Sequence, residues 1–308
     1  MTKVFIDGSA GTTGLRIAER LAARKDLALI RLPEEKRKDA AARKEALNEA
    51  DISFLCLPDE AAREAISLIE NDHTVVIDTS TAHRVHPGWT YGFPEIGGLR
   101  EKIRQARRIA NPGCHASGFI ALVAPLVEGG LLAPDAKLTC FSLTGYSGGG
   151  KKMIAAYETP ERDALLDAPR QYGLTQQHKH LPEMQAVCNL QYAPVFCPVV
   201  APYYAGMEVT VPLFAEEIKG GRAAAEEAYA AYYGKGGLVR FVPEGGEAGF
   251  LSAGAFAGRD DLEISLQGNG ERILLIARFD NLGKGASGAA IQNMNLALGM
   301  EETAGLAL

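Results

Sequence analysis

The first third of the chain alternates short, mostly apolar runs with longer segments whose apolar residues recur at helical spacing. The apolar runs lie at residues 3–8, 27–32, 52–58 and 74–80, and the helical segments lie at 13–24, 41–50 and 59–70. Strands with so little polar alternation are typical of a parallel sheet that is covered on both faces. The pattern therefore predicts consecutive βαβ units and an α/β fold in this part of the chain.

The pattern changes after about residue 136, where strands are separated by long loops with fewer helices between them. The strands are expected at residues 137–147, 208–214, 262–268 and 272–279. This arrangement favours a second lobe built on an antiparallel sheet. The segment 285–299 is again helical, with small and apolar residues on one face, and we expect it to pack back on the first lobe.

Composition supports two lobes and narrows the class of partner. A chain of 308 residues with 47% hydrophobic residues is long for one core, and its net charge of −6 comes without a basic block. We therefore expect a small-molecule ligand and no nucleic acid. No apolar run is long enough to span a membrane, and the opening residues MTKVFIDG lack the layout of a signal peptide, so we expect a cytoplasmic protein with no membrane partner.

Three glycines, Gly8, Gly11 and Gly14, lie between the first strand and the first helix. Glycines at this turn let backbone amides approach a pyrophosphate at a helix N-terminus, and Thr12 and Thr13 add hydroxyl donors. The spacing is G-x-x-G-x-x-G, which differs from the commonest dinucleotide fingerprint. The alternative is a tight turn with no ligand, but its place at the start of a βαβ series favours a dinucleotide.

The residues at the end of the second predicted strand indicate which dinucleotide the site would bind. An NAD site usually has an acidic residue there, whereas this chain reads RLPEEKRK. Arg31, Lys36, Arg37 and Lys38 are suited to a 2′-phosphate, which favours NADP(H). The alternative is a solvated charged loop, because two glutamates lie in the same run.

Cys114 follows a Pro-Gly turn and precedes the apolar run FIALVAPLV. A cysteine at a helix N-terminus has its thiolate stabilised by the helix dipole and by unpaired amides, which makes it a usable nucleophile. From these residues alone, a buried structural cysteine remains an equal alternative. The other cysteines have an ordinary buried context and no C-x-x-C pair, so we expect five free thiols: Cys56, Cys114, Cys140, Cys188 and Cys197.

The histidines supply candidates for proton transfer. His178 and His180 form an H-x-H pair in a polar stretch; no further ligand is spaced to complete a metal site, so we expect no metal. His83 and His86 are expected to be surface loop histidines. His115 follows Cys114 directly and is expected to point away along the helix.

Seven blocks of the chain together resemble the N-acetyl-gamma-glutamyl-phosphate reductases, in particular the shorter, type 2 form. The blocks are GSAGTTGLRI, DTSTAHR, YGFPEI, NPGCHASGF, GYSGGGKKM, HKHLPEM and FDNLGKGASGAAIQNMNLALG. They occur in order over nearly the whole chain, and the last is the most specific. The resemblance implies an enzyme of arginine biosynthesis that reduces an acyl phosphate to an aldehyde with NADPH, releases phosphate, and works through a thioester on cysteine.

The resemblance also implies the domain organisation. A Rossmann-type, parallel-sheet NADP-binding domain is expected at residues 1–113, completed by the C-terminal helix at 284–308. An α+β catalytic and oligomerisation domain with a mostly antiparallel sheet is expected at 114–283. The protein is expected to form a homo-oligomer, either a dimer or a tetramer.

Site residues follow from the resemblance position by position. The nucleophile falls on Cys114, and the general acid/base falls on the pair His178 and His180, with His180 favoured. The glycine loop from Gly8 to Gly14 and the block from Asn281 to Asn293 would hold NADP. Together with the cations after the second strand, the expected cofactor residues are Gly8, Ser9, Gly11, Thr12, Thr13, Gly14, Arg31, Arg37, Lys38, Ser80, Asn281 and Asn293. The substrate residues are Ser147, Gly148 and Lys151. Longer family members often show SGAGR where this chain has SGGGKK, so the residue that binds the substrate's anionic groups stays open.

Two other functions remain open from the sequence. One is a related acyl-phosphate reductase, either an aspartate-semialdehyde dehydrogenase or a lysine-pathway enzyme acting on a carrier-bound substrate. The other is a non-catalytic NADP-binding sensor, which would have no use for Cys114 or the histidine pair.

Overall fold

The computed structural model describes residues 1–234 and 236–308, and the chain divides into two compact units. The first unit comprises Met1–Pro94, Gly98–Pro112 and Ala286–Leu306. The second comprises Glu95–Gly97, Gly113–Gly285 and Ala307–Leu308. Each unit has its own sheet and is described separately.

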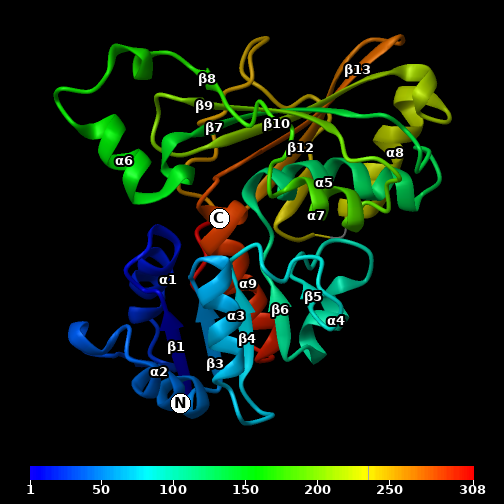
Figure 1. Ribbon diagram of the computed structural model, residues 1–308. Helices are drawn as coiled ribbons and strands as arrows, with labels where there is room; N and C mark the ends of the chain where they lie inside the picture. Colours follow the sequence, from blue (N-terminus) through cyan, green and yellow to red (C-terminus); the bar gives the residue numbers. More distant parts are fainter. Residues whose placement is uncertain (235) are drawn as a thin grey trace. The chain divides into compact units, whose positions relative to one another are not determined.

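The first unit is built on a parallel sheet with the strand order β2-β1-β3-β4-β6-β5 (Figure 1). All of its neighbouring strands run parallel. The strands are β1 (Thr2–Asp7), β2 (Leu27–Ile30), β3 (Ile52–Leu55), β4 (Val75–Asp78), β5 (Thr90–Tyr91) and β6 (Arg108–Ala110). The parallel sheet predicted from the continuous apolar runs is confirmed.

Helices cover both faces of this sheet: α1 (Thr12–Ala22), α2 (Ala40–Glu49), α3 (Asp59–Ser67), α4 (Leu99–Gln105) and α9 (Gly288–Ala297). Successive residues of β1 point to opposite faces. Val4 packs in one cluster with residues of α1 and α9, whereas Phe5 packs in the other with residues of α2 and α3. Because α1 and α2 cover opposite faces, the carboxyl end of β1 lies where the direction of winding changes.

The second unit is built on a mixed sheet with the order β11-β12-β13-β10-β7-β9-β8. The pairs β11–β12 and β7–β9 are parallel, and the other neighbouring pairs are antiparallel. The strands are β7 (Thr139–Gly145), β8 (Arg170–Gln171), β9 (Val195–Ala201), β10 (Met207–Phe214), β11 (Val239–Phe241), β12 (Leu262–Gly268) and β13 (Arg272–Phe279). The predicted mostly antiparallel second sheet is confirmed.

Helix α5 (Cys114–Glu128) forms the core of the second unit. It packs against β10 and β13 and against α7 (Leu181–Val187) and α8 (Gly221–Tyr233), whereas α6 (Gly150–Glu158) follows β7 (Figure 1). Gly118 allows the helix to approach the sheet closely, because a Cβ there would lie 2.5 Å from Cγ2 of Val209.

Pro125 lies inside α5 and has no N–H to donate to the carbonyl of Ala121, four residues earlier. The hydroxyl of Tyr233 on α8 donates to that carbonyl at 2.8 Å. The hydroxyl of Tyr229, one turn earlier on α8, donates to the next carbonyl, that of Leu122. Two tyrosines of α8 therefore satisfy the buried backbone of the proline-containing turn.

We expect Tyr233→Phe to lower the free energy of unfolding by about 1–3 kcal/mol, because it leaves the buried Ala121 carbonyl without a donor. Urea denaturation followed by circular dichroism measures the change. The matched control is Tyr192→Phe, which removes a hydroxyl from a half-exposed ring and should change stability little. Equal stability of the wild type and Tyr233→Phe would contradict this explanation.

Candidate functional site

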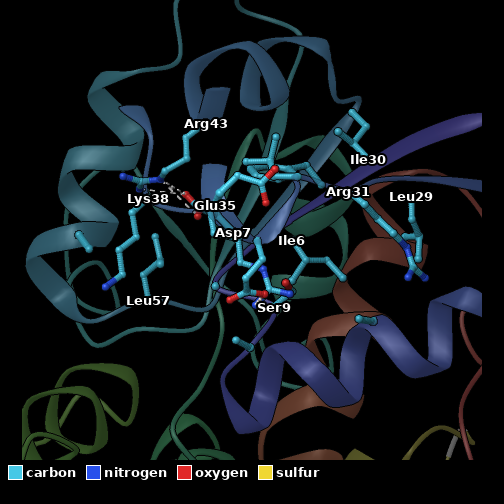
Figure 2. A pocket seen from close by; sticks show the side chains of 18 of the residues that line it. Ile6, Asp7, Ser9, Leu29, Ile30, Arg31, Glu35, Lys38, Arg43 and Leu57 are labelled. Carbon is cyan, nitrogen blue, oxygen red and sulfur yellow. Dashed lines mark hydrogen bonds and ion pairs between the residues drawn. The ribbon is translucent and has the colours of Figure 1, made fainter. Parts of the chain in front are cut away.

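A cavity of about 710 Å³ lies at the carboxyl ends of β1 and β2 in the first unit (Figure 2). Ligands of open α/β sheets bind at this kind of position, where the direction of winding changes. The polar and glycine residues that line the cavity are Asp7, Gly8, Ser9, Arg31, Glu34, Glu35, Arg37, Lys38, Arg43 and Glu64.

Two positions of the glycine loop after β1, Gly8 and Gly14, leave no room for a side chain. Gly8 has φ +86°, and a Cβ there would lie 2.3 Å from the carbonyl oxygen of Cys56. A Cβ on Gly14 would lie 2.6 Å from the carbonyl oxygen of Gly8. The loop is therefore tightly folded, and Gly8, Ser9 and Ala10 line the cavity, so its backbone lies close to the cavity as in a phosphate-binding turn.

The start of α1 is suited to an anion. Its N-cap is Gly11, no side chain caps it, and its first turn has no acidic residue. The hydroxyl of Thr12 is buried and has no hydrogen-bond partner among the described residues. Ser9 lines the cavity, and Thr13 belongs to the same first turn as Thr12. These features fit a bound phosphate group.

The segment after β2 brings cations to the cavity wall, as predicted for Arg31, Arg37 and Lys38. Arg37 forms an exposed ion pair with Glu34, with 2.6 Å between Nη1 and Oε2. The positive charge of this wall is thus partly balanced by the protein itself.

A buried ion pair that the sequence analysis did not identify lies in the same wall. Arg43 on α2 donates two hydrogen bonds of 3.0 Å to Oδ2 of Asp7 at the end of β1, as Figure 2 shows. Burial raises the pKa of the Asp7 carboxyl, and the contacts with Arg43 oppose that rise. The pair ties α2 to the strand that carries the glycine loop.

The prediction that His83, in the loop after β4, lies at the surface is wrong. His83 is not a surface histidine: it is 6% exposed, its Nδ1 lies 2.6 Å from Oδ2 of Asp78, and its ring stacks on Trp89. Ser80 also binds Asp78, through its hydroxyl at 2.7 Å. A buried carboxylate needs such partners, and it draws both side chains inward. His86 is exposed, as predicted.

In the second unit, Cys114 is the first residue of α5. Its N-cap, Gly113, has extended backbone and no side chain to cap the helix, and the first turn carries no acid. The predicted position of a thiol at a helix start is therefore confirmed. A Cβ added to Gly285 would lie 3.0 Å from Cβ of Cys114 and 3.1 Å from the carbonyl oxygen of Asp280, so a larger residue at this position would crowd the cysteine.

Glu183 ties the start of α5 to α7. It lies in the first turn of α7, is 1% exposed, and accepts a hydrogen bond of 3.1 Å from the backbone N–H of Gly113. The two residues are 70 positions apart in the sequence, so no local pattern indicates the contact.

The predicted histidine pair is formed at the start of α7. The ring centroids of His178 and His180 lie 4.8 Å apart, and the backbone N–H of His180 donates to Nδ1 of His178 at 3.3 Å. His180 is buried and directly precedes α7, the helix that carries Glu183. The pair is thereby linked to the segment that presents Cys114.

His115 belongs to the same cluster, contrary to the prediction that it points away. Its ring centroid lies 5.7 Å from that of His178 and 5.5 Å from that of His180. Its Nδ1 lies 2.7 Å from Oγ of Ser142, and its Nε2 lies 2.6 Å from the hydroxyl of Tyr172. Because α5 packs on the sheet, this side chain faces β7, and burial lowers its pKa to about 3, helped by the charges of His178 and Lys179.

A second buried ion pair supports the turn beside Cys114. Lys284 is 2% exposed and lies 2.8 Å from both carboxylate oxygens of Glu95. The preceding Asp280 accepts hydrogen bonds from the backbone N–H groups of Leu282 and Gly283. These contacts hold the π-helical turn Gly283–Ser287, which contains the glycine packed against the cysteine.

The remaining predicted site residues lie in both units. Asn281 donates to the buried Ser147 hydroxyl at 2.9 Å and accepts from the backbone N–H of Gly206 at 3.0 Å. A Cβ on Gly148 would lie 3.3 Å from the same amide, and Lys151 is exposed near the start of α6. Asn293 belongs to the first unit, where it donates to the carbonyl of Gly92 at 2.8 Å. Cofactor binding by the two asparagines stays a prediction, and their observed contacts are structural.

All five cysteines are free thiols, as predicted. Desolvation raises the pKa of Cys56 to about 12, and burial also raises the pKa values of Cys140 and Cys188. No group of three or more histidine, cysteine or acidic residues within the described ranges is placed to hold a metal ion. Among the described residues, no helix is long and apolar enough to cross a bilayer.

Comparison with family models matches both parts of the chain. A model described as the NAD binding domain of semialdehyde dehydrogenase matches residues 3–106. A model described as the semialdehyde dehydrogenase dimerisation domain matches residues 114–281.

Similar proteins extend this result over nearly the full length. An N-acetyl-gamma-glutamyl-phosphate reductase of Sinorhizobium medicae is 45% identical over 96% of this chain and 98% of its own. The reductase of the same name from Brucella ovis is 46% identical over 96% of this chain and 99% of its own. The solved structure of aspartate semialdehyde dehydrogenase II from Vibrio cholerae, complexed with ASA, has a TM-score of 0.68 at 18% identity, covering 97% of this chain and 98% of that chain.

The depressed pKa of His115 has a consequence for stability. Below about pH 6.5 the unfolded chain protonates this imidazole, but the folded chain does not until about pH 3. The free energy of unfolding therefore falls as the pH falls through this range. We expect His115→Gln to reduce the proton uptake on unfolding at pH 5 by about one proton. Urea denaturation at a series of pH values measures the slope, and identical slopes for wild type and variant would refute the assignment.

Proposed function

This chain belongs to the N-acetyl-gamma-glutamyl-phosphate reductase family, and on that premise we propose that it reduces N-acetyl-gamma-glutamyl phosphate to N-acetylglutamate 5-semialdehyde with release of phosphate, as a step of arginine biosynthesis. The observation that carries the proposal is Cys114 at an uncapped helix start, linked through Glu183 to the histidine pair. The relatives at 45–46% identity favour this substrate over an aspartyl phosphate. A cofactor-binding sensor would have no use for this cluster.

We propose NADP(H) as the cofactor, bound by the glycine loop and the cavity of the first unit. The matching family model supports a nicotinamide dinucleotide, and the uncapped start of α1 with the orphaned Thr12 hydroxyl supports its pyrophosphate. Arg31, Arg37 and Lys38 would hold a 2′-phosphate, which supports the phosphorylated form. When bound, NADPH supplies the hydride that reduces the thioester.

Cys114 acts as the nucleophile. The partial positive charge at the start of α5 stabilises its thiolate, because no side chain caps the helix there. The thiolate attacks the acyl carbon, the first amides of α5 hold the resulting oxyanion, and the bond from that carbon to the phosphate oxygen breaks. The products of this step are inorganic phosphate and a thioester on Cys114.

His178 and His180 supply proton transfer, and we favour His180. It takes the proton of Cys114 and later gives a proton to the oxyanion left by hydride transfer, which forms the hemithioacetal. It takes that hydroxyl proton back as the C–S bond breaks and the hemithioacetal collapses to the aldehyde and the thiolate. Such a residue contributes about 10²–10⁴ in rate. His180 adjoins the helix whose Glu183 binds the backbone next to the cysteine, so both groups are set by one element.

Ser147, Gly148 and Lys151 are proposed to bind the substrate. Their turn is held by Asn281, and α6 begins with the exposed cations Lys151 and Lys152. A helix start with nearby ammonium groups is suited to a carboxylate or a phosphate.

We propose a homo-oligomer, a dimer or a tetramer, that uses the sheet of the second unit. Phe141 and Val195 are 43% and 56% exposed and share a face of the sheet with the exposed Pro212 and Leu274. This face is opposite to the one covered by α5, and the matching family model is described as a dimerisation domain. An apolar sheet face of this kind favours association. A cytoplasmic location also stays a prediction.

We expect the purified protein to reduce NADP with N-acetylglutamate 5-semialdehyde only when phosphate is present, which is the proposed reaction run backwards. Cys114→Ser should lose nearly all of this activity and keep NADPH binding, because a serine hydroxyl is far less acidic than a thiol of ordinary pKa about 8.5. Rapid-quench mass spectrometry with the acyl phosphate alone should place an acyl adduct on the peptide that contains Cys114. An active serine variant, or an adduct on another cysteine, would exclude the mechanism.

The preference for NADPH is expected to depend on the cavity wall. The double variant Arg31→Ala and Lys38→Ala should weaken NADPH binding by about tenfold or more and spare NADH, because each cation is proposed to meet only the 2′-phosphate. Fluorescence titration with both cofactors measures the difference. Lys36→Ala is the control, since Lys36 lies in the same segment but outside the described lining. An equal loss for NADPH and NADH would contradict the assignment.

A further inference from the structure

Asn281 links two segments of the second unit just after the end of β13. Its Nδ2 donates to the hydroxyl of Ser147 at 2.9 Å, and its Oδ1 accepts from the backbone N–H of Gly206 at 3.0 Å. Asn281 and Ser147 are each 1% exposed. Both ends of the amide are therefore engaged by the protein itself, inside its core.

A backbone group fixes the orientation of this amide. A backbone N–H can only donate, so the atom of Asn281 that meets Gly206 must be the oxygen. The nitrogen then faces Ser147, whose hydroxyl oxygen accepts. An amide turned over would set its NH₂ group against the N–H of Gly206. The link therefore requires a donor and an acceptor on one planar group.

The turn Tyr146–Gly149, which contains Ser147, rests on the segment before Gly206. The backbone N–H groups of its first two residues donate to the carbonyls of Tyr203 and Tyr204 at 2.9 and 3.0 Å. The turn is thus held through its backbone by one segment and through the Ser147 side chain by Asn281.

The residue before Asn281 holds a different turn. The carbonyl of Asp280 accepts from the backbone N–H of Gly285 at 3.0 Å, and Gly285 is the glycine packed beside Cys114. Two successive residues after β13 therefore support the two parts of the proposed site. Asp280 supports the turn beside the nucleophile, and Asn281 supports the turn that is proposed to bind the substrate.

We infer that Asn281 is a positioning residue for the substrate, which it serves by holding the turn Tyr146–Gly149 in place. The inference rests on the proposed function of that turn. It replaces the cofactor contact expected for Asn281, because the amide nitrogen and oxygen already bind Ser147 and Gly206. Supports of this kind matter for a reaction, since a displacement of about 1 Å can cost about 10²-fold in rate.

The test compares substrate and cofactor affinity in Asn281→Ala. The KM for N-acetylglutamate 5-semialdehyde in the phosphate-dependent reverse reaction should rise by about tenfold or more, because the turn loses a support. The dissociation constant of NADPH, measured by fluorescence titration, should stay unchanged. The rate of Cys114 alkylation by iodoacetamide should also stay unchanged, since the contact between Asp280 and Gly285 remains.

Asn48→Ala is the matched control. Asn48 on α2 also links two groups through one amide: it donates to the carbonyl of Leu68 and accepts from the backbone N–H of Glu70, each at 2.8 Å. Its removal breaks an equivalent link in the first unit and should leave the KM for the semialdehyde unchanged.

Asn281→Asp keeps the test decisive if the alanine variant fails to fold. It has the same shape and keeps both hydrogen bonds, because the Ser147 hydroxyl can turn to donate. It should bind NADPH like the wild type, whereas a carboxylate at a cofactor contact would repel this anion. It should still raise the KM, since its charge lies beside the turn proposed to bind an anionic substrate.

The possible results separate the roles of Asn281. Weaker NADPH binding in either variant would overturn the inference and favour the cofactor contact. Variants that lose stability but keep the wild-type KM would show a purely structural link and also overturn it. A wild-type protein without turnover would reject the proposed function instead. The NADPH titration needs no substrate and would then still decide whether Asn281 contacts the cofactor.

Discussion

The amides at the start of α5 are the constraint on which the catalytic unit depends. Gly113 has no side chain with which to cap them, and the first turn offers no carboxylate. A helix end buried in this state needs a partner for its donors. Glu183 binds the amide just before the helix, and an anion on Cys114 is suited to the first turn itself.

The first unit has the same kind of helix start. Helix α1 also begins after glycine, without a side-chain cap and without an acid in its first turn. In both units the sequence omits the serine, threonine or aspartate that would stabilise the helix by itself. An uncapped helix start is expected where the helix N-terminus binds an anion. The proposed anions are a phosphate group at α1 and a sulfur or oxygen anion at α5.

The architecture was predictable because it depends on local patterns. Continuous apolar runs identify the strands of a covered parallel sheet, and glycine spacing identifies the loop after β1. Strand β9 is harder to recognise, because it contains Pro198 within a short run. The position of Cys114 at a helix start was also readable from the preceding Pro-Gly turn.

The interior of the site was not predictable, because its contacts join distant residues. His115 is separated by 27 residues from Ser142 and by 57 from Tyr172, and nothing near His115 indicates either partner. The same holds for Arg43 with Asp7 and for Lys284 with Glu95. His83 looked like a loop residue, since the buried carboxylate that binds it lies on the preceding strand.

The burial of the other thiols has a consequence for oxidative damage. Peroxides attack thiolates, and desolvation keeps Cys56, Cys140 and Cys188 protonated at physiological pH. Of the two remaining partly buried thiols, Cys114 and Cys197, Cys114 lies at the start of a helix, which stabilises a thiolate, so it is the one most open to sulfenic acid formation. Under the proposed mechanism, oxidation of this one thiol would stop catalysis and leave the fold intact. A cellular thiol could reduce the sulfenic acid again, provided that it reacts before the sulfenic acid is oxidised further.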